Sequence, residues 1–479
     1  MRRLYVAIAL TLCSACAVGP NYRRPETKDL PRGFVNVSQP GFTAGEVQAK
    51  FWQAFGDPTL NHLVEDALAA NKDLARAEAT LRESRAVARL AGFDAYPTIT
   101  AGGAYTHSLA SQHQLFEIPN ATHAERELDS VDVGFDALWE LDFFGRVRRG
   151  IEAARADAQA AEANLRDVQV SVSAEVARNY FVLRGLQDQL AVATSNADNQ
   201  RQTLSLTQVR LEAGRGSELD TSRAEAQLKT TLASIPPLQG SIATTIYRLS
   251  VLTGRMPDSL TSQLSAMRPM PPLPTLNAIG SPEALLRRRP DIRVAERNLA
   301  AATARIGVAI GDLFPKVTFV GSVGYEAANF RDFGKTGSET FGVGPSISWP
   351  AFDLGRVRAR ITAARAQADG ALAAYEAIVL GALEETEGAL VSYGYAQSQR
   401  DTLVEAAAAS DKAARLARQR FEGGLTDFLN VLEAERDALT AQNALAQSRT
   451  QSATSLVAVY KALAGGWLDE PVLANTVSR

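Results

Sequence analysis

Residues 139–160, WELDFFGRVRRGIEAARADAQA, return 210 positions later at 349–370 as WPAFDLGRVRARITAARAQADG. Eleven of the 22 aligned positions are identical, and the same offset later aligns Arg210 with Arg420. An offset held without a gap over so long a span indicates a duplicated structural unit. In both copies the apolar residues alternate before Gly-Arg-Val and follow helical spacing after it. We therefore expect each copy to change from strand to helix at this point.

Four alternating segments, in two pairs, are expected to form strands. Their apolar positions are Ile99, Ala101, Gly103 and Tyr105; Val131, Val133, Phe135, Ala137, Trp139 and Leu141; Val317, Phe319, Gly321, Val323 and Tyr325; and Phe341, Val343, Pro345, Ile347 and Trp349. Strands of about ten residues with one apolar face are typical of membrane β-barrels. A half-buried soluble sheet is the alternative. The opposite faces carry Asp, Glu, Ser, Thr and Gly, which favours membrane strands.

The ends of these strands predict how they sit in a membrane. The polar connections 108–130 and 327–339 suit loops outside the cell. Trp139 and Trp349 come at the other ends of their strands. Aromatic girdles mark membrane interfaces, so we expect both tryptophans at the inner edge of the membrane.

Helices are expected before and after each strand pair. Helix starts at Asp57-Pro58 and Ser281-Pro282 predict helices over 57–93 and 281–314. Long helices over 145–213 and 355–422 follow the strands, and each would extend roughly 100 Å. Glycine turns then lead to return helices over about 220–252 and 427–463, the first interrupted at Pro236-Pro237. In the long helices, alanine-rich residues recur at the alternating three- and four-residue spacing of a coiled-coil seam. We therefore expect each long helix to pack against neighbouring helices on both sides.

The start of the chain predicts export. Residues 1–15 have the basic start, short apolar run and small residues of a signal peptide. The sequence around Cys16 resembles a bacterial lipobox, although Cys13 replaces its usual Leu. That resemblance implies lipidation at Cys16; ordinary cleavage near Ala15 is the alternative. Residues 16–56 are expected to form a lipidated arm, followed by a first repeat at 57–255, a proline-rich connector at 256–280, a second repeat at 281–465 and a tail at 466–479.

Composition argues against an enzyme or a nucleic-acid partner. The net charge is -3, and no phosphate loop or nucleophile–base pattern is present. His107, His113 and His123 fall near one expected external loop, where a metal site is one interpretation and scattered histidines the other. We expect no cofactor and no metal. Arg287, Arg288 and Arg289 could bind an anion, but beside Pro290-Asp291 they favour structural ion pairs.

Four strands cannot close a barrel, and an open sheet edge is not tolerated in lipid. The chain must therefore oligomerise. Two copies would give eight strands with a filled interior, and three would give twelve with room for a lumen.

The chain resembles the TolC-like outer-membrane factors, in particular the NodT-type lipoproteins that serve resistance-nodulation-division pumps. The resemblance spans nearly the whole mature chain and rests on the following motifs: Cys16 to Tyr22, Phe51-Trp52, Asp57-Pro58, Trp139, Phe144-Gly145-Arg146, Arg288 to Glu296, Ile306 to Ala309, Phe314-Pro315 and Tyr460 to Trp467. It implies an α+β membrane protein: a homotrimer with a twelve-stranded barrel, a long helical barrel and an equatorial domain. It also implies passive export of drugs or other small molecules across the outer membrane and periplasm of a Gram-negative bacterium, with a periplasmic adaptor and an inner-membrane pump.

The same resemblance assigns functional positions. Members narrow the periplasmic end of the tube with residues early in the last helix, which here are Leu429, Asn430 and Glu433. Some members have Asp at the position of Asn430, so a less acidic ring is expected; a solvated surface carboxylate is the alternative for Glu433. The adaptor would engage two helical turns, formed by Gly214, Arg215 and Gly216 and by Gly423, Gly424 and Leu425.

A lipidated periplasmic adaptor or coiled-coil scaffold is the rival interpretation. Adaptors carry a helical hairpin too, but usually one hairpin inserted in a lipoyl-like β-domain. This chain has two copies, each preceded by alternating strands. The duplication therefore favours the channel subunit.

Overall fold

The computed structural model describes residues 17–26, 30–31, 33–35, 50–109, 111, 127–275 and 279–465. Cys16, His113, His123 and the tail 466–479 lie outside the described residues. The chain divides into two compact units. One combines the residues before Glu26 with Thr80–Ala161 and Val294–Glu376, and the other combines Glu26–Ala79, Glu162–Arg293 and Ala377–Arg479. Each unit draws on both repeats.

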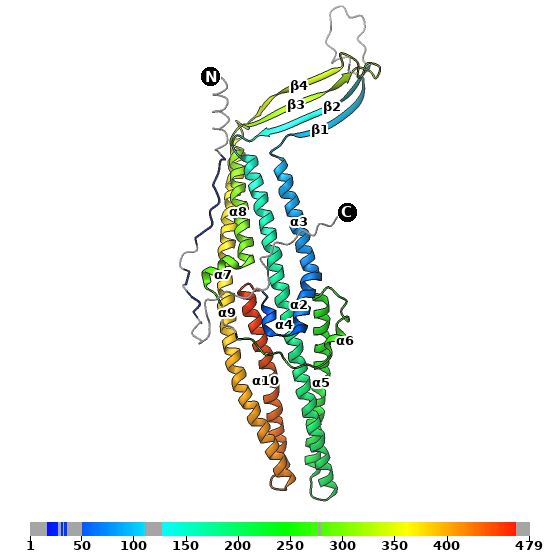
Figure 1. The fold of residues 1–479 in the computed structure, drawn as a ribbon, viewed down its shortest axis with the longest axis vertical. Helices are drawn as coiled ribbons and strands as arrows, with labels where there is room; N and C mark the ends of the chain where they lie inside the picture. The colour runs from blue at the N-terminus through cyan, green and yellow to red at the C-terminus, as the bar shows by residue number, and fades with distance from the viewer. Residues whose placement is uncertain are drawn as a thin grey trace, which may run out of the picture. The chain divides into compact units, whose positions relative to one another are not determined.

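The first unit contains a four-stranded antiparallel sheet in the order β1-β2-β3-β4 (Figure 1). The strands are β1 (Thr98–Leu109), β2 (Glu127–Leu141), β3 (Lys316–Ala327) and β4 (Glu339–Ser348). All four expected strands are confirmed. β2 begins before the alternating pattern does, because Glu127 to Ser130 pair with the last residues of β1.

The pairing register gathers the apolar positions on one face of the sheet. Val133 lies opposite Tyr325, Phe135 opposite Val323, and Val323 opposite Phe341. Since successive residues of a strand point to opposite faces, these side chains share one face. Large apolar residues on this face are exposed, and the exposed fraction of Phe341 is 85%. A soluble sheet would cover such a face, so the finding favours the membrane interpretation.

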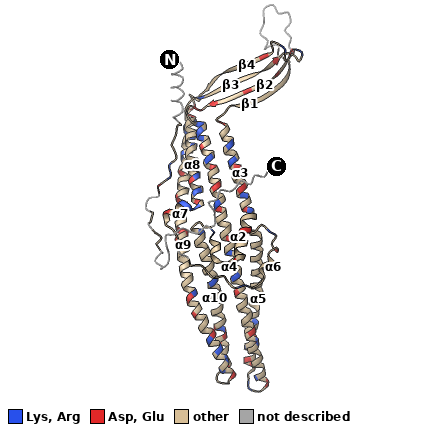
Figure 2. Ribbon diagram, viewed as in Figure 1, with Lys and Arg blue, Asp and Glu red and all other residues tan. Residues whose placement is uncertain are grey.

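Two long helices leave the sheet, α4 (Arg146–Glu212) after β2 and α9 (Leu354–Glu422) after β4. Both agree with the expected ranges to within one residue. Lys, Arg, Asp and Glu are interspersed along them (Figure 2). Within the described part of the chain, none of the helices combines the length and the apolar character needed to cross a bilayer.

The return helices are α5 (Glu218–Leu252) and α10 (Phe428–Ala462), each 35 residues long. The first residues of the two helices are 210 positions apart, and so are their last residues. The sequence offset is therefore also a structural equivalence. The expected interruption at Pro236-Pro237 was wrong, because α5 runs through both prolines. The two prolines lack backbone donors, but they lie on an exposed stretch where water can satisfy the freed carbonyls.

The helices before the strands are each broken once, which the sequence did not predict. The first consists of α2 (Pro58–Ala70) and α3 (Lys72–Phe93), the second of α7 (Pro282–Arg288) and α8 (Pro290–Gly311). Asn71 has extended backbone, and its side chain accepts hydrogen bonds from the amides of Asp73 and Leu74 at 2.8 and 3.2 Å. It therefore starts a new helix. Arg289 is extended because Pro290 disfavours helical backbone before it.

An aromatic cluster forms part of the core of the second unit. A 3-10 helix, η1 (Phe51–Phe55), buries its aromatic side chains. The ring of Phe51 stacks on Tyr460 at 5.2 Å, and the ring of Phe55 lies 4.8 Å from Phe181. The chain before α2 is thereby held against both repeats. A short helix, α6 (Thr261–Leu264), lies in the connector between them.

Candidate channel elements and docking tips

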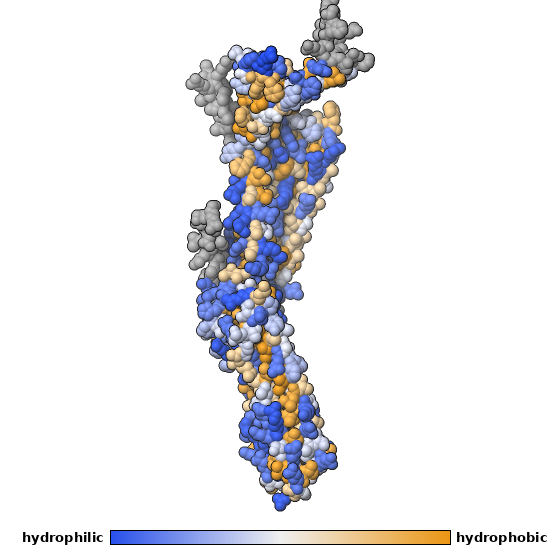
Figure 3. Space-filling model, turned by 90° about the vertical axis from the view of Figure 1, so that its right-hand side faces the viewer, coloured by the Kyte–Doolittle hydropathy of each residue, from blue (hydrophilic) through white to orange (hydrophobic). Residues whose placement is uncertain are grey.

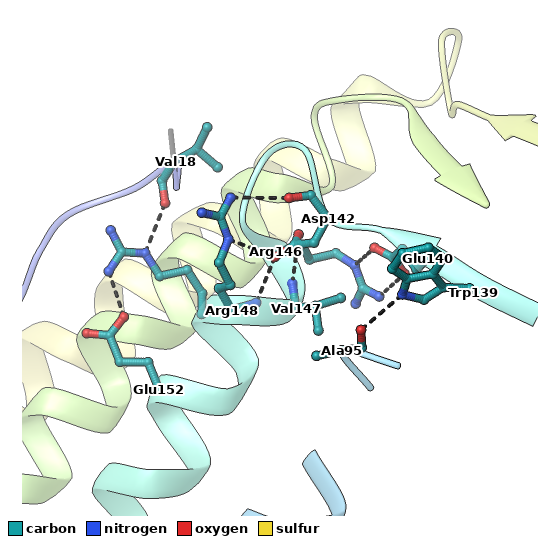
Figure 4. A network of polar contacts seen from close by, with 10 residues as sticks. Val18, Ala95, Trp139, Glu140, Asp142, Arg146, Val147, Arg148 and Glu152 are labelled. Atoms are coloured by element: carbon teal, nitrogen blue, oxygen red, sulfur yellow. Dashed lines mark hydrogen bonds and ion pairs between the residues drawn. The ribbon is translucent and has the colours of Figure 1, made fainter. Parts of the chain in front are cut away.

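The strand-to-helix junction of the first repeat is fixed by polar contacts (Figure 4). A carboxylate oxygen of Asp142 accepts from the amide of Val147 at 3.1 Å, and the other accepts from the amide of Arg148 at 2.9 Å. These contacts satisfy backbone donors at the start of α4. Arg146 donates through Nε to Glu140 at the end of β2, at 2.9 Å. The direction in which α4 leaves the sheet is therefore set by neighbouring residues.

The two tryptophans of the expected girdle make equivalent contacts. The indole N–H of Trp139 donates to the carbonyl of Ala95 at 3.0 Å, and that of Trp349 donates to Leu313 at 3.0 Å. Each carbonyl lies three residues before its strand begins. Trp139 lies two residues inside the end of β2, whereas Trp349 directly follows β4. Both rings remain partly exposed, as a residue at an interface would.

Residues 17–22 lie along the helices of the first unit. The amide of Val18 donates to the carbonyl of Phe144 at 3.0 Å. The buried Arg149 donates to the carbonyl of Val18 at 3.2 Å and to the side chain of Asn21 at 2.6 Å. Tyr22 donates to Glu296 at 3.2 Å, and burial together with this carboxylate raises the pKa of the phenol. The segment that follows Cys16 is therefore bound to both repeats.

The two hairpin tips share one geometry. Gly214 and Gly424 follow α4 and α9 with φ of 68° and 73°, a left-handed conformation that favours glycine. The amides of Arg215 and Leu425 donate to carbonyls five residues earlier, both at 2.8 Å. This is the Schellman motif that ends helices. The residues predicted for adaptor docking, which include Gly216 and Gly423, thus form two exposed turns of matching shape.

The side chain of Arg210 connects the first tip to the second. Arg210 donates to the carbonyl of Phe421, and to that of Glu422 at 3.1 Å. Its guanidinium also lies 4.0 Å from the centre of the Phe421 ring. Phe421 packs in an apolar cluster with Ala224, Phe428 and Val431. A cation on the last carbonyls of a helix is favourable, so this contact stabilises the end of α9.

The residues predicted for the gate share the exposed side of α10. Leu429 is 45% exposed, and Asn430 and Glu433 are also exposed. Asn430 donates to the hydroxyl of Thr426 at 2.9 Å. Their neighbours Phe428 and Val431 face the apolar cluster. The three candidates therefore lie where the described part of the chain leaves α10 uncovered.

Sequence reasoning missed two features near the gate. Leu219 is 56% exposed and stands 210 positions before Leu429, so the repeat offset could have found it. Glu435 is buried, and its carboxylate accepts from Arg418 at 2.6 Å and from Thr203 at 2.9 Å. Nothing in the local sequence distinguishes buried Glu435 from exposed Glu433.

The arginine run before α8 makes the expected ion pairs. Arg289 donates to Asp291 and Glu385, each at a shortest distance of 2.7 Å, and to the carbonyl of Ala462 at 2.9 Å. Arg287 pairs with Glu283 at 2.7 Å on the surface. The structural interpretation is confirmed for these two arginines.

The histidine of β1 pairs with a carboxylate. Nδ1 of His107 lies 2.7 Å from Asp129, which also accepts from the hydroxyl of Tyr105 at 3.1 Å. In the described ranges, no three His, Cys, Asp or Glu side chains gather as a metal ion would require. The two other histidines of the expected loop lie outside those ranges.

Comparison with known proteins agrees with this architecture. The family model described as outer membrane efflux protein matches residues 63–255 and 281–465. Nodulation protein T of Rhizobium leguminosarum bv. trifolii is 30% identical over 460 residues, which is 95% of this chain and 96% of the relative. The solvent efflux pump outer membrane protein SrpC of Pseudomonas putida is 29% identical over 473 residues, which is 96% of this chain and 97% of the relative. The solved outer-membrane channel OprN is 42% identical, with a TM-score of 0.88 over 94% of this chain and all of that chain.

An exposed apolar sheet joined to two long helical hairpins is the architecture of an outer-membrane channel subunit. The chain belongs to the outer membrane efflux protein family. It is a channel protein of the outer membrane of a Gram-negative bacterium, and its family is one of export ducts.

Proposed function

We propose that the chain forms a homotrimer with a twelve-stranded barrel and a helical tube, and that it serves a tripartite efflux pump. The observation that carries the proposal is the sheet, which has one apolar face and, among the described residues, two edge strands without a further partner, β1 and β4. Edges in lipid need partners. Three sheets of four strands close a barrel wide enough to leave a lumen.

The trimer is tested by the mass of the complex. Native mass measurement of the detergent-solubilised full chain should give three copies and no stable monomer. The helices and strands should persist in the same sample, as circular dichroism would report. A monomer that retains its strands in lipid would overturn the proposal.

The tube needs partners at its periplasmic end. We assign adaptor docking to the tips at Gly214, Arg215 and Gly216 and at Gly423, Gly424 and Leu425. Their matching turns would present one kind of surface to a helical hairpin of the adaptor. An inner-membrane pump of the resistance-nodulation-division class would supply the energy. Site-specific photocross-linkers at Arg215 and Leu425 should capture the adaptor, whereas one at Tyr96, beside the sheet, should not.

The exported compounds are small organic molecules under this proposal, because a relative is named for solvent efflux. Passage would be passive through the lumen. Deleting the gene should raise intracellular accumulation of solvents or drugs, and the intact gene should restore export. Unchanged accumulation across a broad panel would contradict this role.

Three further assignments belong to the same proposal. Leu429, Asn430 and Glu433 would narrow the periplasmic mouth, and Trp139 and Trp349 would lie at the inner membrane interface. Cys16 would carry the lipid after removal of residues 1–15. The arm 16–56, the repeats 57–255 and 281–465, the connector 256–280 and the tail 466–479 remain our proposed division. The mass of the mature N-terminal peptide tests the lipid directly.

A further inference from the structure

Within the second unit, one face of α4 packs against α10. In the lower part of Figure 1 the helices follow one another as α9, α10, α4 and α5. Asn196 on α4 donates to Gln442 on α10 at 2.7 Å, and Thr203 donates to Glu435 at 2.9 Å. At the tips, Arg210 contacts the last carbonyls of α9 instead. The interface between the two hairpins therefore involves α4 of the first and α10 of the second.

By the 210-residue offset, α9 is the equivalent of α4, and α5 is the equivalent of α10. Above the tips these two helices form the edges of the four-helix layer in Figure 1, and in the described residues their equivalent faces are uncovered. At the tips themselves, α9 contacts α4 through Arg210 and Arg418, and Ala224 of α5 packs in the apolar cluster of α10. On α10 the residues Ala446, Ala453 and Val457 are buried, with Val457 at 2% exposure. Their equivalents on α5 are Pro236, Ala243 and Tyr247, and Tyr247 is 42% exposed. The same face is thus covered in one hairpin and open in the other.

Figure 3 views the side of the molecule on which α5 lies. In its lower part, hydrophobic colour runs down along this side between hydrophilic patches. An apolar strip bordered by polar residues is typical of a surface that binds another protein.

In the covered pair of faces the small residue is on α4 and the larger one on α10, whereas in the open pair the large residue is on α9 and the small one on α5. In the covered pair, Gly185 on α4 faces Thr450 on α10, and a Cβ at Gly185 would collide with the threonine hydroxyl. The equivalent of Gly185 is Tyr395 on α9, which is 76% exposed. The equivalent of Thr450 is Gly240 on α5, where no atom lies within 4 Å of an added Cβ. A large side chain on one edge thus corresponds to an empty position on the other.

We propose that α9 of one chain packs against α5 of a second copy, with Tyr395 lying over Gly240 of that copy. This inference rests on the proposed trimer and adds the residues that join its subunits. The covered interface supplies the register, because both hairpins have the same length and the same turn. The polar pair Asn196 and Gln442 is replaced by the apolar pair Ala406 and Leu232. Arg420, the equivalent of Arg210, donates to the carbonyls of Leu211 and Glu212 of the second copy.

The size inversion makes the two interfaces distinct. If the partners were exchanged, Tyr395 of α9 would collide with Thr450 of α10, and Gly185 of α4 would leave a void against Gly240 of α5. Since both packing defects are unfavourable, α9 selects α5 and α4 selects α10. The hairpins of three copies can then alternate around a ring in one order only.

Disulfide trapping tests the contact. Tyr395→Cys with Gly240→Cys in one full chain should give covalent dimers and trimers when membranes are oxidised and separated under denaturing conditions. The matched control is Asn196→Cys with Gln442→Cys, which joins two helices of the same chain and should leave the mass at one copy. A trimer by native mass without interchain cross-links overturns this inference and leaves the proposed function standing. A monomer by native mass overturns both.

A size exchange provides a second measurement. Gly240→Trp should lower the temperature at which the detergent-solubilised trimer dissociates, and adding Tyr395→Ala should restore much of the loss. Tyr395→Ala alone should lower the dissociation temperature by less than Gly240→Trp does. Equal effects of Gly240→Trp with and without Tyr395→Ala would show that the two side chains do not meet.

Discussion

In the second unit, the guanidinium of Arg289 donates to the carboxylates of Asp291 and Glu385 and to the carbonyl of Ala462. Burial opposes ionisation of Glu385, but the hydrogen bond and charge of Arg289 and the charge of Lys461 outweigh it, so the pKa of Glu385 is lowered. Asp167 makes no such hydrogen bond within the described ranges, and burial together with the charge of Asp291 raises its pKa. The two acids therefore act on stability with opposite signs.

Glu385→Gln should destabilise the protein at pH 7 by about 1 kcal/mol, because an ion pair with a mostly buried arginine is lost. A lowered pKa in the folded state contributes stability above the ordinary carboxyl pKa, and that stability is lost as pH falls through the lowered value. The variant should therefore lose less stability than the parent between pH 5 and pH 3. Asp167→Asn is the contrasting variant and should stabilise the protein at pH 7. Thermal unfolding across this pH range measures both; equal pH profiles for parent and Glu385→Gln would contradict the assignment.

The proposed gate gives a second prediction at this scale. In a trimer, three Leu429 and three Glu433 side chains would converge, and like charges at close range attract cations to the mouth. Leu429→Ala with Glu433→Gln should raise single-channel conductance in planar bilayers and weaken the preference for cations. Leu416→Ala on α9 is the control, since Leu416 is exposed to a similar degree, 49% against 45%. Unchanged conductance in the double variant would rule out these residues as the constriction.

At the scale of elements, the tips depend on glycines with left-handed backbone. Gly214→Val should destabilise the first tip by about 1–2 kcal/mol, since a β-branched residue is strained at positive φ. Gly381→Ala, in the middle of α9, should instead be neutral or stabilising by up to about 1 kcal/mol. Thermal unfolding measures both effects. Capture of the adaptor by a cross-linker at Arg215 should weaken only in the tip variant; equal capture in both would remove Gly214 from the docking surface.

How far the sequence predicted these elements depended on whether a pattern was local. The absence of proline predicted α4 and α9 to within one residue, and strand alternation predicted all four strands, although β2 begins at Glu127, before its alternating pattern. The breaks at Asn71 and Arg289 were missed, although Pro290 was visible, because an apolar pattern continued across them. The continuity of α5 through Pro236 was missed for the opposite reason, since exposure of that segment is a tertiary property. The buried contacts of Glu435 and Arg149 join segments far apart in the chain, and no local pattern records them.

For the whole molecule, the lipid-facing side of the sheet can be tested with one pair of variants. Phe135→Arg places a charge on the apolar face, which costs about 2–4 kcal/mol near the middle of a membrane. Asp136→Arg is the matched control, because its side chain points to the opposite face. Outer-membrane fractions should contain much less trimer for the first variant and near-normal amounts for the second. Equal assembly of the two would count against a lipid-facing surface.

The unpaired edges of β1 and β4 also have a kinetic consequence. Before assembly, each chain carries two open edges and an uncovered apolar face through an aqueous compartment, where such edges template aggregation. In the proposed trimer, closure requires encounters among three chains, so its rate falls steeply as the local concentration of monomers falls. Slow synthesis therefore prolongs the vulnerable period of each chain. A holding chaperone that covers the sheet would protect each chain during this period.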